Sequence, residues 1–223
     1  MKEGILYVIG GPIGNLEDIT LRALEVLRSL DVLLCEDTRR TRIILEKYGI
    51  KVKTLSYNEH NENKRIPEVI ELLEAGLKVG IMSDAGTPCI SDPGYRLVRE
   101  ARKRGINVSP IPGPSAVVAA LSVSGLPTDS FVFEGFLPRK KGKRKKKLQE
   151  LAEERRTVVI YESVHRIERL LDELQEIFGD REVCLARELT KLHEEVLFGR
   201  LSEVREKLKT VKGEFVITIK GRD

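Results

Sequence analysis

One apolar run that stops at a long loop constrains this chain more than any other feature. Residues 77–82 are mostly apolar, as in a buried strand, and residues 83–94 are mostly small, polar or turn-forming. Open α/β sheets bind ligands in loops at the carboxyl ends of such strands. Gly86 and Gly94 allow a ligand to approach the backbone, and Asp84 can accept hydrogen bonds from hydroxyls or an amine. An ordinary connection of this length is the less favoured alternative.

The first half of the chain alternates short apolar runs with amphipathic stretches, which predicts a parallel sheet. Three prolines and a glycine in residues 110–114 interrupt the alternation, so we expect a domain boundary, a ligand wall or a plain linker there, before a helix that starts at Ser115. The predicted strands are residues 5–9, 32–35, 52–55, 77–82, 108–111, 131–136, 157–161, 183–186 and 215–219. The predicted helices are residues 20–30, a stretch ending near 48, and 66–75, 95–104, 116–123, 164–178 and 201–209, with another from the basic run to about 155.

Composition limits the class of protein. Of 223 residues, 41% are hydrophobic and 33% charged, which is typical of a soluble globular protein, and no apolar run is long enough to span a bilayer. The amino terminus lacks the pattern of a signal peptide. Three widely separated cysteines and three scattered histidines favour neither disulfides nor a metal site. We therefore expect a cytoplasmic protein with no membrane segment and no bound metal.

The positive charge of the chain is concentrated in one segment. Residues 139–147 carry eight positive charges, and subtracting these from the net charge of +4 leaves −4 for the remainder. Clustered cations near the start of a predicted helix oppose its dipole and repel one another, so they are unsuited to stabilising the fold. We interpret them as a solvated segment, mobile without RNA, whose affinity for polyphosphate falls with salt. A merely solvated surface is the alternative.

A series of short motifs spans almost the whole chain. They are residues 12–18 (PIGNLED), 36–39 (EDTR), 83–88 (SDAGTP) with 91–94 (SDPG), 112–116 (PGPSA), 133–138 (FEGFLP), 161–166 (YESVHR) and 187–191 (RELTK). Together they resemble the tetrapyrrole methylase superfamily of S-adenosylmethionine-dependent methyltransferases. Within it, they resemble the branch of small-subunit rRNA ribose 2′-O-methyltransferases. Some members of that branch continue beyond the final strand, so we expect their additional C-terminal RNA contacts to be missing here.

The resemblance implies an α/β fold of the class III methyltransferase type. Two α/β domains are expected, residues 1–113 with a parallel sheet and residues 114–223 with a mixed sheet, and S-adenosylmethionine is expected in the cleft between them. The resemblance also implies a homodimer that methylates the ribose 2′-hydroxyl of a cytidine in 16S rRNA of the assembled small subunit. The cofactor-binding residues it implies are Pro12, Ser83, Asp84, Ala85, Gly86, Thr87, Ile90, Ser91, Ser115, Ala116, Tyr161 and Ala186.

Three residues are candidates for the chemistry of methyl transfer. A ribose hydroxyl is a weak nucleophile, so a base such as Glu162, at the carboxyl end of a predicted strand and pointing to the cleft, is expected to assist. Arg166 and Lys191 are expected to stabilise the oxyanion or hold a phosphate. The alternative is that all three form surface salt bridges. The predicted RNA-binding residues are Arg39, Arg139, Lys140, Lys141, Lys143, Arg144, Lys145, Lys146 and Lys147.

Two other functions remain open from the sequence. The first is a methyltransferase of the same fold that acts on a tetrapyrrole or a modified protein side chain, which gives the basic run no purpose. The second is an RNA-binding module without catalysis, which gives the small-residue loops no purpose. Binding of S-adenosylmethionine separates the second from the others, and a comparison of substrates separates the two enzymes.

Overall fold

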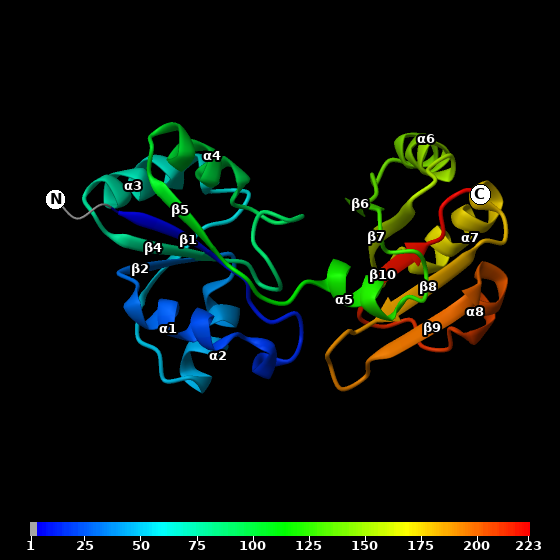
Figure 1. Ribbon diagram of the computed structural model, residues 1–223, viewed down its shortest axis with the longest axis horizontal. Coiled ribbons are helices and arrows are strands. Elements are labelled where there is room, and N and C mark those ends of the chain that lie inside the picture. Colours follow the sequence, from blue (N-terminus) through cyan, green and yellow to red (C-terminus); the bar gives the residue numbers. More distant parts are fainter. Residues whose placement is uncertain (1–3) are drawn as a thin grey trace. The chain divides into compact units, whose positions relative to one another are not determined.

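The computed structural model describes residues 4–223 and consists of two compact units, Met1–Ser115 and Ala116–Asp223. Each unit contains one five-stranded sheet with helices packed on both faces (Figure 1). The predicted α/β class is therefore confirmed. The boundary predicted after residue 113 lies close to the division between the units.

The sheet of the N-terminal unit is parallel throughout, as the alternation of elements predicts. Its order is β3-β2-β4-β1-β5, and the central strands β2 and β4 are almost wholly buried because helices cover both faces. The strands are β1 (Ile5–Ile9), β2 (Val32–Cys35), β3 (Lys53–Ser56), β4 (Lys78–Met82) and β5 (Asn107–Ile111). All five carboxyl ends therefore lie at one edge of the sheet, where the loop after β4 begins.

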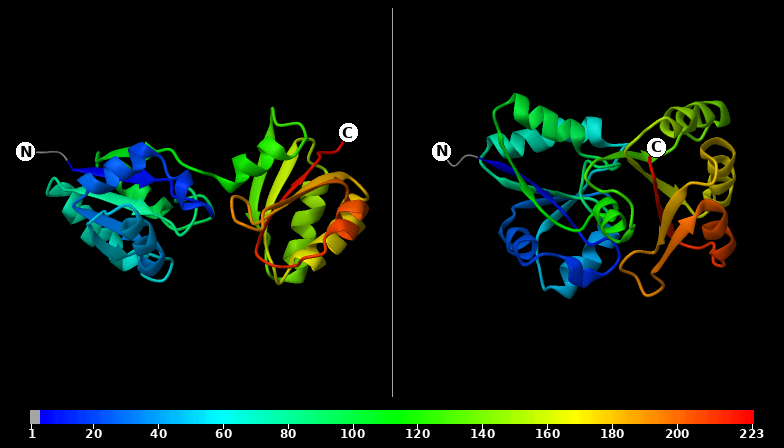
Figure 2. Two further views of the ribbon diagram at one scale, coloured as in Figure 1. Left: turned by 90° about the horizontal axis from the view of Figure 1, so that it is seen from below. Right: turned by 45° about the vertical axis from the view of Figure 1, so that its right-hand side comes forward.

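The helices of this unit form two layers. The α1 and α2 helices pack on one face of the sheet, and α3 and α4 pack on the other, as Figure 1 and the right-hand view of Figure 2 show. Their bounds are Leu21–Ser29 for α1, Thr38–Lys47 for α2, Glu62–Glu74 for α3 and Tyr95–Lys103 for α4, with a short 3-10 turn at Leu16–Asp18. The side chains of Thr20 and Asp37 accept backbone hydrogen bonds and begin α1 and α2, respectively.

The sheet of the C-terminal unit is mixed, with the order β6-β7-β10-β8-β9. The first pair is parallel and the other three pairs are antiparallel. The strands are β6 (Phe131–Phe136), β7 (Thr157–Ser163), β8 (Glu182–Arg187), β9 (Glu195–Arg200) and β10 (Glu214–Ile219). The helices are α5 (Ala116–Val123), α6 (Lys141–Ala152), α7 (Ile167–Phe178) and α8 (Leu201–Lys207).

The two faces of this second sheet have different cores. Leucines and isoleucines of α6, α7 and α8 pack on the face that carries Val158 and Ile160. The opposite face, which carries Val159 and Ala186, is covered by the small-residue helix α5. Because side chains alternate along a strand, neighbouring residues of β7 belong to different cores.

Two predictions from the sequence are corrected by the fold. Strand β9 was not predicted, because it lies at the sheet edge and its apolar residues Val196 and Phe198 are exposed. Helix α3 begins at Glu62, four residues before the predicted start, because Asn58 and Asn61 organise a polar first turn that has no apolar periodicity. The basic run opens the helix α6, as the sequence predicts, and residues 141–147 belong to it.

Candidate functional site

Backbone contacts join the loops that follow β1, β4 and β5 at the carboxyl edge of the first sheet. The Gly11 amide donates to the Gly86 carbonyl at 2.8 Å, and the Gly86 amide donates to the Pro12 carbonyl at 3.2 Å. A Cβ atom added to Gly113 would lie only 2.6 Å from the carbonyl oxygen of Gly10. The three loops are thus packed backbone against backbone, and at Gly10 and Gly113 only glycine leaves room for this approach.

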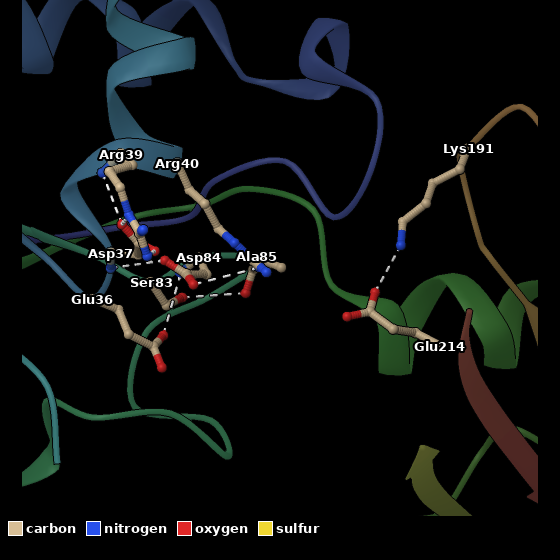
Figure 3. Close-up of polar contacts among 9 residues, drawn as sticks. All are labelled: Glu36, Asp37, Arg39, Arg40, Ser83, Asp84, Ala85, Lys191 and Glu214. Atoms are coloured by element: carbon tan, nitrogen blue, oxygen red, sulfur yellow. Dashed lines mark hydrogen bonds and ion pairs between the residues drawn. The ribbon is translucent and has the colours of Figure 1, made fainter. Parts of the chain in front are cut away.

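Asp84 links the loop after β4 to the loop after β2 through hydrogen bonds and an ion pair. Its Oδ1 accepts a hydrogen bond from the Asp37 amide at 2.9 Å, and its Oδ2 lies 3.5 Å from Arg40 Nη1 (Figure 3). In return, the Asp84 amide donates to Glu36 Oε2 at 3.4 Å. The Asp84 carboxylate, which the sequence predicts to bind a ligand, therefore also connects two loops.

This edge is acidic and partly shielded from water. Burial raises the pKa of Glu36, and repulsion from Asp84 and Glu59 adds to the increase, against a backbone hydrogen bond that lowers it. Burial, followed by repulsion from Glu36, raises the pKa of Asp92 to about 6. Burial also raises the pKa of the Cys89 thiol to about 11. An accumulation of carboxylates in a region of low water content favours the binding of a cation.

The residues predicted from the N-terminal unit for the cofactor lie in these loops. Pro12, Ser83 and Gly86 are buried, and Ser83 Oγ donates to the Ala85 carbonyl at 3.2 Å. Ala85, Ile90 and Ser91 are exposed, while Asp84, Thr87 and Ser115 are half-buried. The structure thus provides both a packed loop backbone and accessible side chains at one edge of the sheet.

The remaining predicted cofactor residues share one face of the second sheet. Tyr161 of β7 and Ala186 of β8 both lie opposite Val216 of the intervening strand β10. Ala116, at the start of α5, packs against the same apolar cluster. The three residues therefore lie on the face that α5 covers.

Glu162 lies elsewhere than the sequence suggested. Strand β7 continues to Ser163, so Glu162 points to the face packed by α6, α7 and α8, opposite to Tyr161. Its side chain is 1% exposed and accepts a hydrogen bond from Arg166 Nη2 at 2.8 Å. Neither residue forms the surface salt bridge of the alternative interpretation. The expectation that Glu162 leaves the end of the strand and points to an open cleft is wrong, because its side chain is buried within the unit.

Lys191 is held between two carboxylates after β8. Its Nζ lies 2.8 Å from Glu188 Oε1 and 2.8 Å from Glu214 Oε2, the latter pair being shown in Figure 3. Burial lowers the pKa of Lys191, but the hydrogen bonds to Glu188 and Glu214 outweigh it and the net pKa is raised. With 31% of its side chain exposed, Lys191 presents a fixed cation that cannot act as a base near neutral pH.

The basic segment, residues 139–147, contains two kinds of cation. Arg144 is 3% exposed and binds Glu173 of α7 through two hydrogen bonds of 2.6 and 2.7 Å. Lys145 and Lys147 also have carboxylate partners, at 2.9 Å to Glu176 and 3.4 Å to Glu134, respectively. Among residues 4–223, no ion-pair partner is found for Arg139, Lys140, Lys141, Lys143 or Lys146. The prediction that Arg144 is an accessible RNA contact is therefore wrong.

Arg39, the RNA-binding residue predicted in the other unit, is exposed but not free. Its guanidinium binds the Asp37 carboxylate at 2.7 and 3.0 Å. These hydrogen bonds, together with one from the Arg39 amide, hold the pKa of Asp37 at about 2. Arg39 therefore helps to begin α2.

Several residues at these places were missed by the sequence interpretation. Glu36 and Asp92 lie within quoted motifs, and a carboxylate directly after a buried strand was an available signal for Glu36. Phe133 and Phe136 both contact the ring of Tyr161, with centroids 4.9 and 5.6 Å away. Their spacing of three residues in one strand predicts opposite faces, so the sequence concealed this contact.

The described part of the chain contains neither a metal-binding cluster nor a membrane-spanning helix. Within residues 4–223, no group of three or more His, Cys, Asp or Glu side chains is arranged to hold a metal ion. No helix of that range combines the length and apolar character needed to cross a membrane. Cys35, Cys89 and Cys184 are free thiols in this part of the chain.

Comparison with known proteins gives a consistent result. Residues 5–205 match the family model described as Tetrapyrrole (Corrin/Porphyrin) Methylases. A Thermotoga maritima protein named ribosomal RNA small subunit methyltransferase I is 51% identical over 222 residues, which cover 99% of this chain and 100% of the relative. A Vibrio cholerae protein of the same name is 50% identical, over 97% of this chain and 77% of its own.

Solved structures share the fold at lower identity. The uroporphyrin-III-C-methyltransferase of Thermus thermophilus superimposes with a TM-score of 0.69 at 23% identity, covering 98% of this chain and 94% of its own. The cobalt precorrin-4 methyltransferase CbiF gives a TM-score of 0.71 at 18% identity, with 97% and 94% covered. At these identities the likeness concerns the fold alone.

Proposed function

The chain belongs to the tetrapyrrole (corrin/porphyrin) methylase family, as its motifs predicted, and from this membership we propose that it methylates small-subunit rRNA. The reaction is transfer of a methyl group from S-adenosylmethionine to the ribose 2′-hydroxyl of a cytidine in 16S rRNA. One observation carries the proposal: identity of about half over nearly the whole chain to proteins named for this substrate. A tetrapyrrole substrate would leave the unpaired cations of the basic segment without a role.

The carboxyl edge of the first sheet suits a small cationic cofactor. Its loops carry small residues that let a ligand reach the backbone, and Glu36, Asp84 and Asp92 make it electronegative. Bound S-adenosylmethionine supplies an electrophilic methyl group on a positive sulfur. The residues we propose to hold it are Pro12, Ser83, Asp84, Ala85, Gly86, Thr87, Ile90, Ser91, Ser115, Ala116, Tyr161 and Ala186.

Lys191 is the residue we propose to act on the ribose oxygen. Because Glu188 and Glu214 fix its ammonium group and keep it protonated, it can stabilise developing negative charge or hold a flanking phosphate. Glu162 and Arg166 form a buried pair, so we propose that they position the neighbouring chain and do not accept the proton. Much of the acceleration then comes from alignment of the hydroxyl with the methyl group.

A substrate comparison with radiolabelled S-adenosylmethionine tests this function. We expect the label to enter rRNA of small subunits lacking the modification, and not uroporphyrinogen. The labelled position should survive alkaline hydrolysis, because a 2′-O-methylated ribose cannot cleave its own phosphodiester. Naked rRNA in parallel shows whether the assembled subunit is required. Label in a tetrapyrrole, or in no substrate, would contradict the proposal.

Cofactor binding has its own matched control. Ala85→Leu places a larger side chain in the exposed part of the proposed site, and we expect calorimetry to show at least a tenfold loss of affinity for S-adenosylmethionine, or about 1.4 kcal/mol. Ala75→Leu adds the same atoms to an exposed alanine after α3, outside these loops, and should bind normally. Equal affinity of the two variants would move the cofactor site elsewhere.

The assembly and compartment are also proposals. We infer a cytoplasmic homodimer, supported by the free thiols and by exposed apolar residues Val196 and Phe198 on the edge strand β9. Sedimentation should give twice the mass of one chain. A monomer at micromolar concentration would contradict the dimer and leave the proposed reaction intact.

A further inference from the structure

An irregularity in β6 determines where its aromatic side chains point. The pairing of β6 with β7 shifts register between Phe133 and Gly135, and Gly135 has φ of +72°. Residues three apart in a regular strand lie on opposite faces, whereas the extra residue of a bulge returns them to the same face. Phe133 and Phe136 therefore both contact the ring of Tyr161.

The bulge does not serve to bury Phe136. This side chain remains 57% exposed, although burial is what an aromatic residue ordinarily gains from such an arrangement. Its ring is tilted by 60° relative to the ring of Tyr161, which supports it from one side. The bulge thus places the ring of Phe136 beside the ring of Tyr161 and leaves it accessible to solvent.

The chain directly after Phe136 is held firmly. Leu137 is buried, and its carbonyl accepts a hydrogen bond from Arg166 Nη2 at 2.9 Å. The same Nη2 donates to the buried carboxylate of Glu162 at 2.8 Å. Phe136 is therefore part of a rigid support, so little conformational entropy is lost when a ligand stacks on it.

Unpaired positive charge begins three residues further on. Arg139, Lys140 and Lys141 lead into α6, and Lys143 and Lys146 follow on that helix, all without an ion-pair partner among residues 4–223. A rigid exposed aromatic ring followed closely in the chain by free cations is a combination by which proteins bind single-stranded nucleic acid, since the ring stacks on a base and the cations contact phosphates.

We propose that Phe136 is a stacking platform for an unpaired base of the RNA substrate, with the phosphates beside that base contacted by the free cations of the basic segment. This inference rests on the proposed rRNA function and adds a residue that selects an unpaired nucleotide. Because Phe136 contacts Tyr161, which we propose to lie at the cofactor, the stacked base is near the target nucleotide or is the target itself.

Substitution of Phe136 tests the platform against a control in the same strand. Phe136→Leu keeps an apolar side chain but removes the ring, and we expect about a tenfold weaker binding of a single-stranded oligoribonucleotide. Phe136→Tyr should bind like the original chain. Phe131, 40% exposed at the other end of β6, provides the control Phe131→Leu, which should leave affinity unchanged.

A fluorescent variant reports the stacking directly. The chain contains no tryptophan, so Phe136→Trp introduces a single indole at the platform. We expect its fluorescence to be quenched by the oligoribonucleotide and not by an abasic oligonucleotide of equal length and charge, although both bind through the cations. Equal quenching by the two, or none by either, would overturn the proposal.

The outcomes separate this inference from the proposed function. If the original chain methylates small subunits and Phe136→Leu binds RNA as tightly as Phe131→Leu, the platform is wrong and the function stands. If the original chain neither binds nor methylates RNA, both are wrong. Sedimentation of Phe136→Leu completes the test: loss of a dimer with unchanged RNA affinity would show that Phe136 contacts a second copy and would overturn the platform.

Discussion

The carboxyl edge of the first sheet and the basic segment at the start of α6 have opposite charges. They also differ in how far those charges are buried. At the sheet edge, Glu36, Asp84 and Asp92 are partly buried, and backbone amides of the loops after β2 and β4 donate hydrogen bonds to Asp84 and Glu36. On α6, Lys143 and Lys146 are exposed to solvent, and Arg144 is the one buried cation of this helix, with Glu173 as its carboxylate partner. Changes in the partly buried region at the sheet edge should therefore alter the stability of the protein. Changes in the solvated cations of α6 should alter binding alone.

The largest expected effect tests the backbone packing at the sheet edge. Gly113→Val would place a Cβ 2.6 Å from the Gly10 carbonyl oxygen, so the loops must separate. We expect a loss of roughly 4 kcal/mol or more in the free energy of unfolding, measured in urea. Gly142→Ala on α6 meets no atom within 4 Å and should instead stabilise the protein by about 0.5–1 kcal/mol. Similar effects of the two substitutions would remove the contrast between the regions.

The next effect concerns the one buried cation of the basic segment. Arg144→Ala leaves the Glu173 carboxylate without its bidentate partner, and we expect a loss of about 3 kcal/mol in the free energy of unfolding. Lys143→Ala, one residue away and without an ion-pair partner among the described residues, should change stability by less than about 0.5 kcal/mol. If the two variants unfolded alike, Arg144 would be a surface residue like its neighbours.

A smaller effect depends on pH. The pKa of Asp92 is raised to about 6, above the ordinary 3.8, so the folded state binds a proton more readily than the unfolded state. The stability this provides is complete below pH 4 and is lost as pH rises through 6. Asp92→Asn removes the titration, and we expect the unfolding free energy of the original chain to fall by about 2 kcal/mol relative to the variant between pH 4 and 7. Parallel pH profiles would contradict the acidic edge.

The smallest expected effect appears in RNA binding and not in stability. Replacing both Lys143 and Lys146 by alanine should weaken binding to small subunits by about 1 kcal/mol and reduce the slope of log affinity against log salt by roughly 1.5. Lys145→Ala removes a cation already paired with Glu176, so its change per charge should be smaller. An equal change per charge in both variants would mean that ion pairing on α6 does not decide which cations meet RNA.

Local patterns in the sequence determined much of this protein. The apolar runs of β1, β2 and β4 are wholly local signals, and they identified the parallel sheet and the loop after β4. The motifs identified the family, because each is a short run of residues that can be recognised without knowing its contacts in the fold. The small residues of the loops were likewise visible, since close packing demands glycine wherever the backbone approaches itself.

Tertiary structure alone decided what the charged and aromatic residues do. Glu162 is a buried ion-pair partner of Arg166 and not an accessible base, because β7 extends to Ser163. The face on which a strand residue lies depends on how far its strand pairs with its neighbours. Arg144 is buried because it binds Glu173 of α7. Glu173 lies 29 residues further along the chain, so no local sequence pattern could reveal this contact. The direction of Phe136 depends on a bulge, which shifts the period of two that strand predictions assume. Interactions between residues distant in sequence thus assigned the roles that composition and spacing left open.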